Sequence, residues 1–178
     1  LEEMLARPLP ALVPEDIPDL NWVAISQAAL PPVSAGRFTI HGSHDKNRVA
    51  RGPNAILIDA GEAFGTAHHA TTYGCLSAID RLTRQHAFKN VLDLGCGSGV
   101  LAIAVARALP AARILATDID RQSIMVAAAN VRLNATARHV EVAHADGVSA
   151  PVVRRRVPFD LVIANILAGP LITLAGDI

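Results

Sequence analysis

The chain has 178 residues, which is enough for one domain with a sizeable hydrophobic core. Hydrophobic residues make up 51% of the sequence and charged residues 18%, a composition that folds rather than remaining disordered. Sixteen basic residues balance sixteen acidic residues, which argues against direct nucleic-acid binding through phosphate contacts. The strongly basic cluster at 154–156 is interpreted as a solvated loop.

The two cysteines, Cys75 and Cys96, are too few for a disulfide framework and lack the spacing of metal ligands. They favour a reducing compartment, so we expect a cytoplasmic protein without a bound metal. No apolar run is long enough to span a membrane, and the first residues do not resemble a signal peptide. Because the chain begins with Leu1 rather than methionine, we expect it to be a piece of a longer protein.

The first thirty residues are predicted to form a linker followed by a short helix. Residues 1–20 contain four prolines and several acidic residues, as linkers do. Asn21 is a candidate N-cap for a helix over 22–30, and Pro31 and Pro32 would end that helix.

Two strands are predicted next. Residues 37–41 and 55–59 have the alternating or apolar pattern of strands, and a polar segment containing glycine separates them. We expect these strands to form an antiparallel hairpin. The chain is accordingly divided into a linker and pre-domain segment, 1–45, and a ligand-binding domain, 46–178.

From residue 71 onward, the pattern alternates between helices and short apolar strands. Helices are predicted over 71–85, 100–109 and 121–133, with a further helical stretch from Gly169 or Pro170. Strands are predicted over 91–94, 114–117, 140–143 and 159–164. This alternation indicates an α/β fold with a parallel, doubly wound sheet, whose strands are apolar throughout because both of their faces are covered.

The strongest functional pattern is the glycine-rich loop after the first strand of this series. Gly95, Gly97 and Gly99 occupy alternate positions between a strand and a helix. Glycine permits a tight turn and leaves no side chain between backbone and ligand, and open α/β sheets bind ligands at the carboxyl ends of their strands. Asp93, near the end of the strand, is a candidate acceptor for a ligand amine or for the loop's own amides.

Three further acidic residues follow the next two strands. Asp118 comes nineteen positions after Gly99, where an acid can accept hydrogen bonds from both ribose hydroxyls of an adenosine. Asp120 is the better candidate for the N-cap of the following helix. Asp146 follows the third strand, and it is either a partner for the adenine amino group or a turn residue before Gly147.

The glycine loop alone leaves two cofactor classes open. The run from Gly97 to Ala102 also fits G-x-G-x-x-A, the pattern of dinucleotide-binding loops. An NAD-binding oxidoreductase is therefore an alternative on this pattern. Cys96, within the loop, is interpreted as a small buried side chain rather than a nucleophile.

Longer motifs resemble one family of methyltransferases. The run Asp93–Gly99 resembles motif I of class I methyltransferases, in which Asp-x-Gly-x-Gly-x-Gly is usual. Residues 63–72 and 164–171 resemble two signatures of the family that methylates large-subunit ribosomal protein eleven. The similarity also includes 22–27, 31–38 and 41–45, so it extends from about Asn21 to the end of the chain.

The resemblance implies S-adenosylmethionine as cofactor and assigns residues to it. The family's cofactor contacts fall on Thr72, Gly95, Asp118 and Asn165, beside Asp93, Gly97 and Asp146 from the reading above. The first signature departs from the common form, because Ala67, His68 and Ala70 replace glycine, threonine and proline.

The resemblance further implies a Rossmann-like sheet with strand order three, two, one, four. Family members have seven strands and a small N-terminal domain that recognises the ribosomal protein, so we expect both ends to be incomplete. With strands five to seven missing, the strand at Phe159–Ala164 should be an unpaired edge, through which the chain could associate with a second copy.

The implied activity is N-methylation of a ribosomal protein, at lysine ε-amines and at the N-terminal α-amine. The catalytic residue is expected to be Asn165, whose amide oxygen, together with the backbone carbonyl of Ile166, would accept hydrogen bonds from the substrate amine. A non-catalytic, truncated cofactor-binding domain is the remaining alternative.

Overall fold

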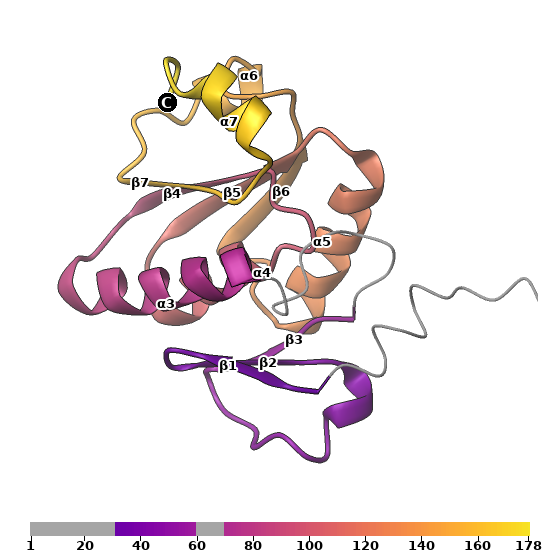
Figure 1. Cartoon of the computed structure of the whole chain (residues 1–178). Helices are drawn as coiled ribbons and strands as arrows, with labels where there is room; N and C mark the ends of the chain where they lie inside the picture. The colour runs from indigo at the N-terminus through magenta and orange to yellow at the C-terminus, as the bar shows by residue number, and fades with distance from the viewer. Residues whose placement is uncertain (1–30, 60–69) are drawn as a thin grey trace, which may run out of the picture.

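The computed structural model describes residues 31–59 and 70–178. It contains a small three-stranded sheet beside a four-stranded sheet that helices cover on both faces (Figure 1). The predicted helix over 22–30, its cap Asn21 and most of the signature at 63–72 lie outside the described residues.

The four-stranded sheet is built from the strands predicted after residue 71. These are β4 (Asn90–Leu94), β5 (Arg113–Asp118), β6 (Val140–His144) and β7 (Leu161–Ala164). All neighbours are parallel and the order is β6-β5-β4-β7, which confirms the expected order of three, two, one, four. Leu94 is in register with both Thr117 and Ala164, so the carboxyl ends of the strands lie along one edge.

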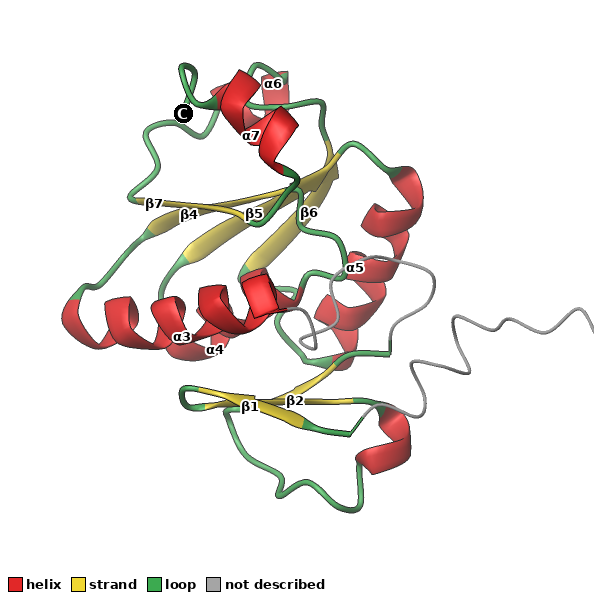
Figure 2. Ribbon diagram, viewed as in Figure 1, coloured by secondary structure: helices red, strands yellow, loops and turns green. Residues whose placement is uncertain are grey.

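Helices cover the two faces of this sheet unequally (Figure 2). On one face lie α3 (Ala70–Gln85), α4 (Val100–Ala108) and α5 (Arg121–Leu133). On the other lie the shorter α6 (Pro151–Arg154) and α7 (Ala168–Leu174). The three longer helices begin and end within one residue of the expected bounds, because caps and breakers mark their ends: Asp120 caps α5, and Pro110 follows α4.

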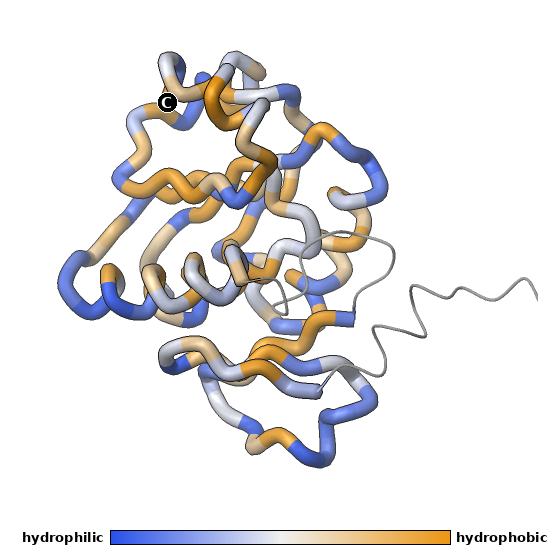
Figure 3. Tube along the Cα trace, viewed as in Figure 1, coloured by the Kyte–Doolittle hydropathy of each residue, from blue (hydrophilic) through white to orange (hydrophobic). Residues whose placement is uncertain are grey.

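The core follows from the alternation of side chains along the strands. Val91 and Ile114 point to the face of α3, α4 and α5, whereas Leu92 and Leu115 point to the face of α6 and α7. Figure 3 shows hydrophobic residues along these strands and hydrophilic residues at the end of α3. Both faces are therefore packed, as continuous apolar strands require.

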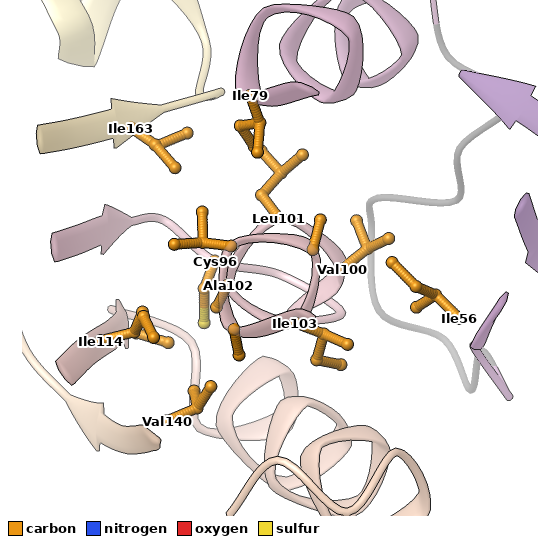
Figure 4. Packing of buried hydrophobic residues seen from close by; sticks show 14 of the residues in the cluster. Ile56, Ile79, Cys96, Val100, Leu101, Ala102, Ile103, Ile114, Val140 and Ile163 are labelled. Atoms are coloured by element: carbon orange, nitrogen blue, oxygen red, sulfur yellow. The ribbon is translucent and has the colours of Figure 1, made fainter. Parts of the chain in front are cut away.

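Helix α4 lies at the centre of the larger cluster. Every residue from Val100 to Ala106 is buried. Figure 4 shows why: Ile79 of α3, Ile114 of β5 and Ile56 of β3 approach α4 from different sides. A helix that is surrounded in this way needs apolar residues on all its faces.

The small sheet differs from the prediction. It consists of β1 (Val33–Ala35), β2 (Phe38–His41) and β3 (Ala55–Leu57), in that order. The expected antiparallel hairpin between 37–41 and 55–59 is wrong, because β2 and β3 are parallel. The antiparallel partner of β2 is β1, which a tight turn at Gly36 and Arg37 connects to it.

The physical reason is the length of the connection between β2 and β3. Residues 42–54 include a 3-10 helix, η1 (Ser43–Asp45), and are long enough to return the chain to the start of β2. The small sheet therefore contains residues on both sides of residue 45. The division into 1–45 and 46–178 stays a prediction.

Polar contacts, as well as apolar packing, attach the small sheet to the rest of the fold, and two of them involve α3 and the C-cap of α5. At the β1–β2 turn, the Asp80 carboxylate of α3 accepts hydrogen bonds from the Arg37 backbone N–H, at 3.1 Å, and from its guanidinium. At β3, the Asn134 side chain pairs with the backbone N–H and C=O of Leu57, at 3.0 and 2.7 Å. Both contacts join segments that are far apart in the sequence.

Within the described residues, β7 pairs with β4 alone, so it is an edge strand as expected. Self-association through this edge stays a prediction. Across 31–59 and 70–178, none of the helices is long and apolar enough to cross a membrane.

Candidate functional site

The predicted site residues gather along the carboxyl edge of the large sheet. Gly95 follows β4, Asp118 ends β5, Asp146 lies just beyond β6, and Asn165 follows β7. Thr72, in the first turn of α3, reaches the same edge through its contact with Asn165. The topology thus brings together residues that the sequence separates widely, at the edge where open α/β sheets bind ligands.

The glycine loop folds back onto the end of β5. The N–H groups of Gly95 and Cys96 both donate to the backbone oxygen of Thr117, at 2.8 and 2.9 Å. Gly95, Gly97 and Gly99 have φ angles of +70°, +51° and +79°, in the left-handed region that glycine tolerates best. The loop's shape therefore depends on all three glycines.

Two of these glycines also permit close packing. A Cβ on Gly95 would overlap the Cγ2 methyl group of Ile166, the residue after Asn165. A Cβ on Gly99 would lie 3.2 Å from the Cβ of Ala127 on α5. The loop is consequently held between the segment after β7 and helix α5.

Asp118 supports the loop as well as facing the site. One carboxylate oxygen accepts the Gly97 N–H at 2.9 Å, and the other accepts the Asp120 N–H at 2.9 Å. The side chain is half-buried, so it also remains open to a ligand. Asp120 in turn accepts the N–H groups of Gln122 and Ser123, which confirms it as the cap of α5.

Asp93 is almost completely buried, with 1% of its surface exposed. Its Oδ2 accepts the Ala102 N–H in the first turn of α4, at 3.0 Å, while Oδ1 has no partner among the described residues. Burial raises the pKa of Asp93 to about 7; the hydrogen bond from Ala102 partly offsets this, and the negative charge of Asp118 adds to it. The site therefore holds a buried carboxyl group whose ionised form a nearby positive charge would stabilise.

Cys96 is buried beside these two acids. Burial, followed by the charges of Asp93 and Asp118, raises the pKa of its thiol above the ordinary value. A thiol in this environment stays protonated and packs as a small apolar group.

Asn165 and Thr72 form a direct contact across the site. The Asn165 amide nitrogen donates to the Thr72 hydroxyl oxygen at 3.1 Å. Thr72 is 1% exposed, whereas Asn165 is half-buried. This bond uses Nδ2, which leaves the amide oxygen of Asn165 to accept a hydrogen bond from another group.

Other predicted residues are less constrained. Asp146 is exposed, two residues after the end of β6, and both interpretations of it remain predictions.

Sequence reasoning missed Asn130 of α5, a fully buried amide that donates to the backbone oxygen of Ser98 in the glycine loop. Its signal was a polar residue at helical spacing from Ala127 on an apolar face. Among the described residues, no cluster of histidine, cysteine and acidic side chains could hold a metal ion.

A family model described as ribosomal protein L11 methyltransferase (PrmA) matches residues 3–178. The chain belongs to this family. The match supports the methyltransferase interpretation of the glycine loop and does not support the oxidoreductase alternative.

Named relatives agree with the family match. The chain is 52% identical over 164 residues to the ribosomal protein L11 methyltransferase of Brucella suis, covering 92% of this chain and 57% of that protein. It is 54% identical over 167 residues to that of Rhizobium etli, covering 94% and 57%. The chain thus spans a little more than half the length of these relatives.

A solved structure supports the fold. The crystal structure of ribosomal protein L11 methylase from Lactobacillus delbrueckii subsp. bulgaricus superposes with a TM-score of 0.69 and 29% sequence identity. The matched region covers 82% of this chain and 72% of that one. The Rossmann-like methyltransferase fold expected from the motifs is therefore confirmed.

The packing of Gly95 against Ile166 predicts that Gly95→Ala destabilises the site. The new methyl group would displace Ile166, and alanine is strained at a φ of +70°. We expect a loss of at least about 1 kcal/mol in the free energy of unfolding, measured by urea denaturation. Gly74→Ala in α3 is the matched control, because a Cβ there meets nothing within 4 Å. Equal stability of the two variants would contradict the packing argument.

The raised pKa of Asp93 predicts a pH dependence of stability that Asp93→Asn removes. The folded protein retains a proton that the unfolded chain releases at about pH 4, so Asp93's contribution is present below that pH and is lost as the pH rises through about 7. The variant's stability relative to wild type should therefore rise by up to about 1.4 kcal/mol per pH unit between pH 5 and 7. Urea denaturation at pH 5, 6, 7 and 8 measures this slope, and parallel curves for the two proteins would disprove it.

Proposed function

We propose that this protein is an S-adenosylmethionine-dependent N-methyltransferase that acts on ribosomal protein L11. The acceptors would be lysine ε-amines and the N-terminal α-amine. The observation that carries the proposal is the Asn165–Thr72 contact beside the glycine loop, in a chain that belongs to the L11 methyltransferase family. The relatives' names supply the substrate.

The residues of the site fit a cationic, adenosine-containing cofactor. Gly95 and Gly97 would let it approach the backbone, Asp118 would accept hydrogen bonds from its ribose hydroxyls, and Asp146 would meet its adenine amino group. The buried Asp93 carboxyl group, with the negative charge of Asp118 nearby, would favour a cofactor that carries positive charge, as S-adenosylmethionine does. The partnerless Oδ1 of Asp93 supports this fit, because a buried carboxylate is stabilised by a nearby positive charge.

The same groups argue against an anionic dinucleotide. A pyrophosphate binds helix N-termini through free backbone N–H groups. Here the Ala102 N–H of α4 already donates to Asp93, and the Gly97 N–H already donates to Asp118. A phosphate beside the glycine loop would find those two N–H groups already occupied, and it would lie close to the carboxyl groups of Asp93 and Asp118.

The chemistry needs orientation more than activation by a strong base. The cofactor supplies an electrophilic methyl group, and the acceptor must be a neutral amine whose lone pair points at that methyl. The Asn165 amide oxygen and the Ile166 backbone carbonyl would accept hydrogen bonds from the amine and fix its direction. Thr72 holds the Asn165 amide in the orientation that presents the oxygen. Holding the reactants in this geometry supplies most of the rate enhancement.

We assign cofactor binding to the proposed domain at 46–178 and retain the expectation of a cytoplasmic enzyme. This chain spans 57% of the length of its relative from Brucella suis. We therefore assign recognition of the ribosomal protein to the whole protein rather than to this chain alone. We also propose that a second copy binds at the β7 edge, and a measurement of molecular mass in solution tests this.

Isothermal titration calorimetry separates the cofactor classes. We expect the chain to bind S-adenosylhomocysteine and S-adenosylmethionine with a stoichiometry of one, and to show no heat of binding with NADH. Wild-type protein that stays folded and binds NADH but not S-adenosylhomocysteine would refute the proposed function.

The orientation of Asn165 predicts a matched pair of threonine variants. Thr72→Val removes the hydroxyl that accepts from Asn165, and we expect methyl transfer to L11 to fall by about 100-fold because the amide loses its fixed direction. Thr71→Val changes the exposed neighbour on the same turn of α3 and should retain the wild-type rate. Initial rates with a radiolabelled methyl donor measure both. Equal rates for the two variants would exclude the positioning role, and no transfer by wild type that binds the cofactor would favour the non-catalytic alternative.

A further inference from the structure

We propose that Asn130 is a positioning residue of the cofactor site, which fixes the glycine loop to the end of the small sheet. The proposal rests on the proposed function, because it concerns affinity for the same cofactor. It assigns a role to a residue that lies on α5, outside all of the motifs identified in the sequence.

Asn130 connects two segments that do not otherwise share a hydrogen bond among those described. Its Nδ2 donates to the backbone oxygen of Ser98 at 2.9 Å, and its Oδ1 accepts the backbone N–H of Asp59 at 3.3 Å. Ser98 lies between two glycines of the loop, and Asp59 follows β3 by two residues. One fully buried side chain therefore fixes both backbones.

The residues of α5 and its C-cap that share a face with Asn130 also contact neighbouring segments. Ser123, Ala127, Asn130 and Asn134 are spaced by four, three and four residues, which places them on one face of the helix. Ser123 bonds Asp120, Ala127 lies against Gly99, and Asn134 pairs with Leu57. This face of α5 thus contacts the acidic loop after β5, the glycine loop and β3.

The chemistry of the contact requires an amide. Asn130 donates at one end and accepts at the other, and both partners are backbone groups. An aspartate retains the acceptor but lacks the donor, and a leucine lacks both. Because the glycine loop has few side chains to hold it, loss of the Ser98 contact allows the loop to move away from the position that the cofactor requires.

A purely structural role would predict a different outcome, and Asn134 provides the comparison. Asn134 is also buried and also donates to backbone oxygens, those of Leu57 and Asn130. It makes no contact with the glycine loop among the hydrogen bonds described. Asn134→Asp therefore removes the same kind of bond and buries the same charge as Asn130→Asp, without releasing the loop.

The test compares the Kd of S-adenosylhomocysteine for wild type, Asn130→Asp and Asn134→Asp, by calorimetry at a temperature where circular dichroism shows all three folded. We expect Asn130→Asp to raise the Kd about tenfold and Asn134→Asp to change it less than twofold. An unchanged Kd for Asn130→Asp, or an equal rise in both variants, overturns the proposal. Failure of wild type to bind refutes the proposed function instead.

Hydrogen exchange on wild type gives a second measurement that does not depend on the variants' folding. Saturating S-adenosylhomocysteine should slow exchange of the Asp59 amide, which Asn130 links to the loop. The Thr39 amide, bonded to Asn54 at the far end of β2, is the control and should be unaffected. Slower exchange at Gly95 and Cys96 with no change at Asp59 overturns the proposed link.

Discussion

The end of β5 determines the shape of the ligand site. Thr117 offers one backbone oxygen to two N–H groups of the glycine loop, and Asp118 offers a carboxylate to a third. The glycines have no side chains and permit many conformations, so the loop relies on these bonds, on the packing of Gly95 and Gly99, and on the Asn130 contact with Ser98. Anything that fixes β5 in the sheet therefore also helps to fix the loop.

This dependence gives Asp118 two functions in one side chain. Its carboxylate holds the loop and the start of α5 and, in the proposed function, accepts the ribose hydroxyls. A substitution at Asp118 would disturb both, so loss of binding alone would not show a direct contact. Comparing ligands with intact and deoxygenated ribose in wild type and variant separates them, because energies add only when the contacts are independent.

The sequence predicted the large sheet well because local patterns determine it. Continuous apolar runs mark the strands, and glycine turns and the Asp120 cap mark where helices begin. The rules for parallel sheets then restrict the order of the strands. The small sheet was harder, since the partner of β2 depends on where the chain goes between residues 42 and 54. No local pattern distinguishes a parallel return from an antiparallel hairpin there.

For the site, too, the sequence identified individual residues but not the contacts between them. The motifs identified Asp93, Gly95, Asp118 and Asn165, but the contact of Asn165 with Thr72 joins positions 93 residues apart. The role of Asn130 was also hidden, because a polar residue on the buried side of a helix suggests a buried amide but does not identify the backbone groups that it binds. Contacts between distant segments, rather than residue types, were the information that the sequence lacked.

Helix α3 mechanically couples the small sheet to the candidate site. Thr72 in its first turn touches Asn165, and Asp80, two turns further along, holds the β1–β2 turn. A helix rises about 1.5 Å per residue, so roughly 12 Å of stiff backbone separates these two contacts. The small sheet and the amide at the end of β7 are thus attached to one rigid rod, and a force applied to the first is transmitted to the second.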